Sequence, residues 1–236
     1  MKKNLNQNLI NLINYYNLLN TNFLLSNNPI KRVGENATVA FAGNKTEKLE
    51  KLKKKIQSIK NCDLKKNATN LVFGDGNINS KIMIIGEGPG ANEDMEGLPF
   101  VGRAGKLLDK MLNAIQLDRS KVYISNVVNY RPPNNRKPEP SEINRYSEFL
   151  KEHISIIDPK ILILMGSTAM EAILGSNKKI SKERGQWKEV IIKQKNYKTI
   201  VTFHPAYLLR KPDQKKFSWE DLKIVRKEID QQNIEI

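Results

Sequence analysis

The ten residues 81–90, KIMIIGEGPG, decide the fold of this chain. An apolar run that ends at a glycine is typical of a buried parallel strand, which carries apolar side chains on both faces. Similar runs follow at 122–128, 161–165 and 199–203, with helical patterns between them. Strands that alternate with helices predict an α/β fold, in three α/β/α layers around a central sheet of four parallel strands.

Helical spacing of apolar residues fills the intervals between these strands. It predicts helices over 104–116, 141–157, 167–174 and 219–231. Ser141 is the expected N-cap of the second of these helices. The proline-rich segment 131–140 is expected to form a rigid loop.

The first 60 residues differ in composition from the rest. Apolar residues at helical spacing predict a short amphipathic helix over 9–19, and the polar stretch 27–44 has the composition of a linker. A second, lysine-rich helix is expected over 46–60, as a solvated helix with one stripe facing the core. We therefore expect a helical extension with a linker over 1–60 and the α/β domain over 61–236.

Composition limits the possible functions without choosing among them. The chain has 236 residues, 40 Lys plus Arg against 25 Asp plus Glu, and a net charge of +15. Such a surplus indicates either a polyanion partner, most often nucleic acid, or a lysine-rich codon bias. No apolar run is long enough to predict a membrane span, and no secretory signal is expected. The single cysteine, Cys62, excludes an internal disulfide, and we expect a cytoplasmic protein.

The residues that follow the predicted strands are the first candidates for a site. In open α/β sheets, ligands bind beyond the carboxyl ends of the strands, so these residues should converge. They are the loop 86–90, Asn126, residues 166–167, and His204 with Pro205. The glycine loop can expose amide donors, but it matches neither a Walker loop nor the dinucleotide fingerprint.

The side chains in and near these positions each have a functional and a structural interpretation. Glu93 and Asp94 are either solvated carboxylates or a base and electrostatic stabiliser. Phe100 is either a core residue or a platform on which a base stacks. Asn126 suits the edge of a nucleobase, although it could also tie down a neighbouring loop. His204 should point into the cleft, whereas His153, within a helical stretch, is expected to be structural or at the surface.

Several motifs in this order resemble those of uracil-DNA glycosylases of the family-4 type. They are 86–94 (GEGPGANED), 97–105 (GLPFVGRAG), 123–128 (YISNVV), 131–136 (RPPNNR) and 204–209 (HPAYLL), and the resemblance spans about 62–222. It implies a monofunctional, metal-independent enzyme of base-excision repair. Such an enzyme hydrolyses the N-glycosidic bond of a uracil that has been flipped out of DNA.

The resemblance also implies a role for individual residues. Phe100 would stack on uracil, Asn126 would bond its O4 and N3–H edge, and His204 would donate to O2. Either Glu93 or Asp94, with a preference for Asp94, would hold the water and stabilise the sugar cation. Glu87 and Gly88 would bind the base. Phosphates would be bound by Arg103, Arg136 and Arg210. Leu208, after Pro205, would be an apolar wedge that fills the vacated stack. Leu208 has the alternative of being a core leucine.

The sequence departs from this family at the iron–sulfur cluster. Members typically hold a cluster with four cysteines, of which only Cys62 is present here. The other three positions read as Ile59, Tyr130 and Tyr146, so we predict no cluster, with both tyrosines packed into its space. The loop 131–140 lacks the histidine that forms a covalent bond to DNA in a related branch, which favours hydrolytic turnover.

Two other functions stay open at this level. One is a non-catalytic DNA-binding or polymerase-associated protein on the same fold, and the other is an enzyme that acts on small nucleotides. For the lead hypothesis we expect a monomer that binds uracil-containing DNA and hands its product to downstream repair proteins. The sequence leaves open the range of bases released and the preference for single or double strands.

Overall fold

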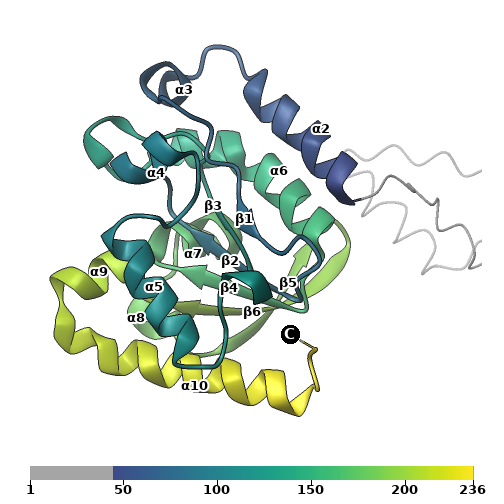
Figure 1. Cartoon of the computed structure of the whole chain (residues 1–236), viewed down its shortest axis with the longest axis vertical. Helices are drawn as coiled ribbons and strands as arrows, with labels where there is room; N and C mark the ends of the chain where they lie inside the picture. The colour runs from purple at the N-terminus through teal and green to yellow at the C-terminus, as the bar shows by residue number, and fades with distance from the viewer. Residues whose placement is uncertain (1–44, 236) are drawn as a thin grey trace, which may run out of the picture. The chain divides into compact units, whose positions relative to one another are not determined.

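The computed structural model describes residues 45–235, and the helix and linker expected at 9–19 and 27–44 lie outside this range. Six strands form one sheet in the order β1-β3-β2-β4-β6-β5 (Figure 1). Their bounds are β1 Asp75–Gly76, β2 Ile82–Gly86, β3 Tyr123–Asn126, β4 Ile161–Met165, β5 Trp187–Ile192 and β6 Lys195–Thr202.

The sheet is mixed, which corrects the prediction of four parallel strands. β3, β2, β4 and β6 pair in parallel, whereas β1 pairs antiparallel with β3 and β5 antiparallel with β6. The two edge strands escaped the sequence pattern for physical reasons. β1 has only two residues, and β5 is a partly exposed hairpin partner that lacks the continuous apolar run of a buried strand.

Helices cover both faces of the sheet. Their bounds are α2 Lys45–Gln57, α3 Asp63–Asn67, α4 Ala91–Glu96, α5 Arg103–Asn113, α6 Pro140–Ile157, α7 Ser167–Leu174, α8 Ile180–Glu183, α9 Pro205–Arg210 and α10 Lys215–Gln231. Short 3₁₀ turns lie at Arg119–Lys121, Pro133–Asn135 and Pro212–Gln214. Within residues 45–235, no helix is both long and apolar enough to cross a membrane.

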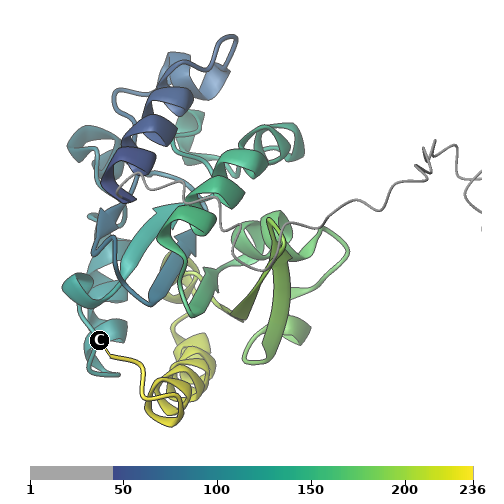
Figure 2. The same cartoon turned by 90° about the vertical axis from the view of Figure 1, so that its right-hand side faces the viewer.

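Alternation along the strands divides the core into two layers. In β2, Met83 and Ile85 pack with residues of α2, α6 and α7, whereas Ile82 and Ile84 pack with residues of α5 and α10. Figure 2 shows α10 on the opposite side of the sheet from α2 and α6. The two apolar layers hold the strands, so the loops at their carboxyl ends are free to form a site.

The start of α6 differs from the prediction. The helix begins at Pro140, after Glu139, and the backbone N–H of Glu139 donates to the Glu142 carboxylate at 2.8 Å. Ser141 is therefore inside the helix, and its prediction as the N-cap is wrong. Proline suits the first helical position because its missing N–H would have no partner within the helix.

The lysine-rich helix α2 packs on α6. Leu49, Leu52 and Ile56 are buried, and Lys55 pairs with Glu152 of α6 at 2.7 Å. The helix therefore shares the hydrophobic core of the α/β domain, although it falls within the predicted extension. Lys45 also donates to the carbonyl oxygen of Ile157 at the end of α6, at 2.7 Å, whereas Lys51 and Lys54 are exposed.

Candidate active site

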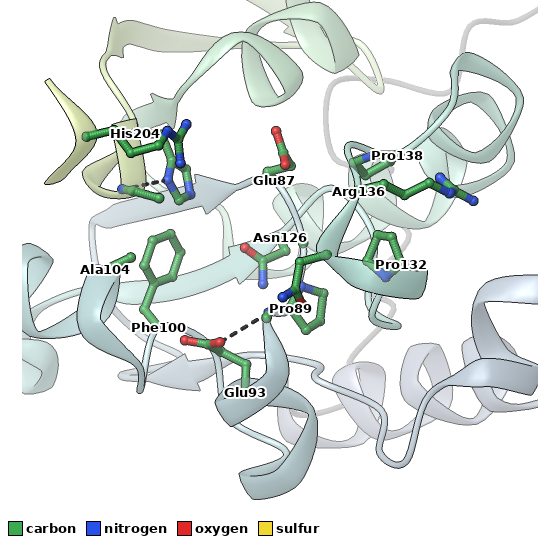
Figure 3. Close-up of a pocket in the computed structure, with 15 residues that line it drawn as sticks. Glu87, Pro89, Glu93, Phe100, Ala104, Asn126, Pro132, Arg136, Pro138 and His204 are labelled. Atoms are coloured by element: carbon green, nitrogen blue, oxygen red, sulfur yellow. Dashed lines mark hydrogen bonds between the residues drawn. The ribbon is translucent and has the colours of Figure 1, made fainter. Parts of the chain in front are cut away.

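A cavity of about 240 Å³ lies at the carboxyl ends of the parallel strands, where the loops after β2, β3 and β6 meet (Figure 3). The residues that line it are Glu87, Gly88, Pro89, Gly90, Glu93, Phe100, Ala104, Asn126, Pro132, Asn135, Arg136, Pro138, His204, Ala206 and Arg210. The convergence expected from the strand ends is therefore confirmed for the loop after β2, for Asn126 and for His204.

Gly86 allows Asn126 and Phe100 to meet. The register of β2 and β3 places Gly86 beside Asn126. A Cβ on Gly86 would lie 2.4 Å from Asn126 Oδ1 and 2.6 Å from the Phe100 ring, closer than atoms can approach. Only a residue without a side chain therefore permits this contact.

Asn126 is a buried residue whose amide atoms reach the cavity. The residue is 3% exposed, and within residues 45–235 its side chain makes no hydrogen bond. An amide that reaches a cavity without a protein partner is available to bind a ligand. It offers one acceptor and an N–H donor side by side.

His204 presents a donor to the same cavity. It caps α9, and its Nδ1 accepts the backbone N–H of Ala206 at 3.1 Å. Since Nδ1 is an acceptor, the proton of the neutral ring lies on Nε2. Burial first, and then the charge of Arg210, lower the pKa of His204 to about 4. The ring stacks at 5.4 Å between centroids on Phe100, so both line one wall.

The two adjacent carboxylates of α4 point to different places. Glu93 borders the cavity, and its oxygens accept the backbone N–H groups of Gly90 at 3.1 Å and Gly102 at 2.8 Å. Asp94 is 3% exposed and accepts the backbone N–H groups of Thr69 and Asn70 instead. The structure therefore brings Glu93 to the site and leaves Asp94 outside it.

Glu87 supplies a second carboxylate to the cavity. It follows β2 directly, and its Oε2 accepts the hydroxyl of Thr168 at 2.5 Å. Thr168 is buried near the start of α7, at the end of β4. A neighbouring strand end thus orients this side chain, and Oε1 makes no hydrogen bond within residues 45–235.

The three arginines expected at phosphates occupy different positions. Arg210 is exposed at the rim of the cavity, and Arg103 is exposed at the start of α5 without bordering it. Arg136 borders the cavity, but its guanidinium pairs with both oxygens of Glu142, at 2.8 and 2.6 Å. Arg136 therefore holds the proline-rich loop to α6.

The expected wedge residue lies in the core. Leu208 is 1% exposed and packs in the layer under α5 and α10, whereas the next residue, Leu209, is 37% exposed. Pro205 is buried at the first position of α9. The interpretation of Leu208 as a core leucine agrees with this placement.

Comparison with known proteins identifies the family. The family model described as the uracil DNA glycosylase superfamily matches residues 73–224. The chain belongs to the uracil-DNA glycosylase superfamily.

Several of its similar relatives are type-4 uracil-DNA glycosylases. A type-4 uracil-DNA glycosylase of Sulfurisphaera tokodaii is 44% identical over 188 residues, which are 76% of this chain and 84% of that protein. One of Thermotoga maritima is 42% identical over 165 residues, 70% of this chain and 84% of its own. One of Archaeoglobus fulgidus is 41% identical over 170 residues, 70% of this chain and 85% of its own.

The residues present in this superfamily member do not fit an iron–sulfur cluster. Cys62, Tyr130 and Tyr146 are buried in one apolar cluster, against which Ile59 packs. The Sγ of Cys62 lies 3.5 Å from the hydroxyl of Tyr146. A cluster needs about four thiolates, and the chain has one cysteine. Among residues 45–235, no group of three or more His, Cys, Asp or Glu is placed to hold a metal ion.

Sequence reasoning missed several residues of the site. Pro132 and Pro138 line the cavity, and Thr168 orients Glu87. The only signal for Thr168 was its place after β4, one residue beyond the stretch 166–167 already expected there. Prolines in loops carry no chemical signal, so only the folded loop reveals their place at the wall.

We expect His204 to remain neutral with its proton on Nε2 from physiological pH down to about pH 5, because its lowered pKa leaves it uncharged there. The measurement is the ¹⁵N shift of the two histidine rings of the chain in a labelled protein. His153 is the internal comparison, because its Nε2 lies 2.9 Å from the Tyr123 hydroxyl and burial lowers its pKa to about 3. A His204 ring that titrates near its ordinary pKa, or carries its proton on Nδ1, would contradict the geometry.

Proposed function

We propose that this protein is a hydrolytic uracil-DNA glycosylase that removes a flipped uracil from DNA and leaves an abasic site. The observation that carries this proposal is the convergence, in one cavity, of an aromatic platform, an amide without a protein partner and a neutral imidazole donor. These are Phe100, Asn126 and His204. The identity of the chain to type-4 uracil-DNA glycosylases supports the same reaction.

Asn126 supplies the discrimination between uracil and cytosine. Its Nδ2 donates to O4 of uracil while its Oδ1 accepts the N3–H. Cytosine presents a donor at position 4 and an acceptor at N3, so both partners would be left unpaired. A site built for hydrogen bonds rejects such a mismatch by a factor of about 10⁴.

His204 stabilises the leaving group. When the bond from C1′ to N1 breaks, its electron pair passes to the uracil ring and negative charge develops on O2. The Nε2–H of the neutral ring is placed to donate to that oxygen, and preorganised donors of this kind are strong in a site that excludes water. Because Nδ1 is held by α9, the donor needs no rearrangement during the reaction.

The two carboxylates of the cavity stabilise the sugar cation and activate the attacking water. Glu93, held by two backbone N–H groups, faces the positive charge that forms on the sugar. The Oε2 of Glu87 accepts the Thr168 hydroxyl. Its Oε1 is available to orient a water molecule, and it accepts a proton from that water as the water oxygen bonds to C1′. This assignment replaces the preference for Asp94, whose carboxylate binds the segment before β1.

The positive surface suits a DNA partner. Arg210 and Arg103 are exposed, at the cavity rim and at the start of α5, where phosphates on either side of a flipped nucleotide would lie. Contacts with phosphate give an affinity that falls steeply with salt. We keep the predictions of a monomer, of a cytoplasmic location and of hand-over to downstream repair proteins.

We also propose that the enzyme works without an iron–sulfur cluster. The buried packing of Tyr130, Tyr146 and Cys62 occupies the positions that the family's cysteines would take. Burial, and then the neighbouring Cys62, raise the pKa of the Tyr130 hydroxyl, so it stays protonated in this apolar cluster. Aromatic packing thus replaces the metal in joining α6 to the segment around Cys62.

The central test is release of free uracil from an oligonucleotide with a single uracil, in single- and double-stranded form. We expect release and an intact abasic strand, and a loss of at least ~100-fold for Asn126→Asp, because a carboxylate has no N–H for O4. Asn113→Asp is the matched control, since Asn113 is exposed at the end of α5. DNA binding without release would instead support the non-catalytic alternative.

The carboxylate assignment has its own prediction. Glu87→Gln and Glu93→Gln should each lower the rate of uracil release per folded molecule by at least ~100-fold, since both side chains border the cavity. Glu93→Gln should also lower the melting temperature, because both Glu93 oxygens accept backbone N–H groups. Asp94→Asn should lower the melting temperature and leave the rate per folded molecule nearly unchanged. Single-turnover rates and thermal unfolding measure the two effects. A rate loss for Asp94→Asn as large as that of the glutamates would reverse the assignment.

We assign the wedge that fills the vacated base stack to Leu209. Leu209→Ala should slow release from duplex DNA about tenfold, but barely from single strands, where no stack has to be replaced. The neighbouring change Leu208→Ala should instead destabilise the fold by about 2–5 kcal/mol, because it opens a cavity in the core. Equal effects of Leu209→Ala on both DNA forms would exclude a wedge at this position.

A further inference from the structure

We propose that Arg119 is the positioning residue for the base-stacking platform: it holds the backbone of Phe100 in the conformation that presents the ring to the cavity. This inference rests on the proposed function, because it takes Phe100 as the surface on which the flipped base stacks. Arg119 itself does not line the cavity.

Phe100 has an unusual backbone. Its φ is +57°, in the left-handed region that is unfavourable for a bulky residue. Strain of this kind persists only where the surrounding structure over-determines it, and it concentrates at functional sites. The ring is nevertheless well placed, since it lies against Gly86 and stacks on His204.

Arg119 forms hydrogen bonds to the two peptide groups that flank the Phe100 Cα. Its Nη1 donates to the carbonyl oxygen of Pro99 at 3.1 Å, and its Nη2 donates to the carbonyl oxygen of Phe100. These carbonyls belong to the peptide planes before and after the Cα. Holding both planes therefore holds both φ and ψ, which set the direction of the side chain.

Two carboxylates hold Arg119 in turn. Its Nη1 pairs with Asp75 of β1 at 2.9 Å, and its Nε pairs with Asp109 of α5 at 2.8 Å. The Arg119 side chain is 27% exposed, so these contacts form partly away from water. The planar guanidinium has five N–H donors in a fixed fork, and a lysine could not reach all four acceptors at once.

Helix α5, which follows Phe100, packs against the Phe100 carbonyl group and restricts its movement. A Cβ on Gly105 would lie 1.6 Å from the Phe100 oxygen, so the first turn of α5 packs directly on this peptide. The peptide is thus confined between α5 and the guanidinium. The strained backbone persists because neither neighbour leaves it room to relax.

The experiment compares Arg119→Met with Arg145→Met in the full-length protein. Arg145 is a matched control: it donates to the carbonyls of Lys60 and Asn61, and Asn61 also has a positive φ, of +51°, but neither borders the cavity. We expect Arg119→Met to raise the inhibition constant of free uracil and the KM of the DNA substrate about tenfold, and Arg145→Met to leave both unchanged.

A double-mutant cycle separates positioning from general stability. If Arg119 acts through Phe100, Arg119→Met added to Phe100→Ala should cause no further rise in the uracil inhibition constant. Arg119→Lys should recover part of the loss, because one ammonium can hold one of the two carbonyls. Losses that multiply in the double variant, or an equal loss for Arg145→Met, would overturn the proposal.

A structural readout keeps this test independent of the reaction. In the unmodified protein, ring protons of Phe100 and His204 should give nuclear Overhauser effects, which Arg119→Met should abolish and Arg145→Met should retain. If the unmodified protein releases no uracil, the proposed function fails. The Phe100–His204 contact still tests whether Arg119 positions the Phe100 ring. Retention of this contact in Arg119→Met would refute the positioning role of Arg119, even in an active enzyme.

Discussion

The missing side chain at Gly86 is the constraint on which the site depends. The parallel register of β2 and β3 places this residue beside Asn126, and the Phe100 ring occupies the space that a Cβ would need. The amide must approach the edge of the base while the ring covers its face, so the two side chains must be direct neighbours. Asn126 and Phe100 are neighbours here because β2 ends in Gly86, which has no side chain between them.

Hydrogen bonds hold the surroundings of this contact, and Phe100 also packs in the apolar layer with α5 and α10. Arg119 holds the Phe100 backbone, α9 holds the His204 ring, and Thr168 holds Glu87. Each of these supports comes from a different element. Functional groups on loops therefore gain the rigidity that catalysis by preorganised dipoles requires.

Apolar and aromatic packing holds the region around Cys62. Tyr146 is fully buried on α6, and Tyr130 closes the segment after β3. Both pack with Cys62 and Leu64 in the same layer as α2. Burial of aromatic surface here contributes a hydrophobic stabilisation that does not depend on the redox state of the surroundings.

The sequence by itself determined the four buried strands, the helices between them and the identity of most cavity residues, because apolar periodicity and strand-end position are local properties. It did not determine β1 or β5, whose pairing depends on distant partners. Nor could it separate Glu93 from Asp94, or Leu208 from Leu209. Adjacent residues share a sequence environment, and only packing decides which side chain turns toward the cavity. The role of Arg119 is tertiary for the same reason, since its acceptors lie on β1, α5 and the Phe100 loop.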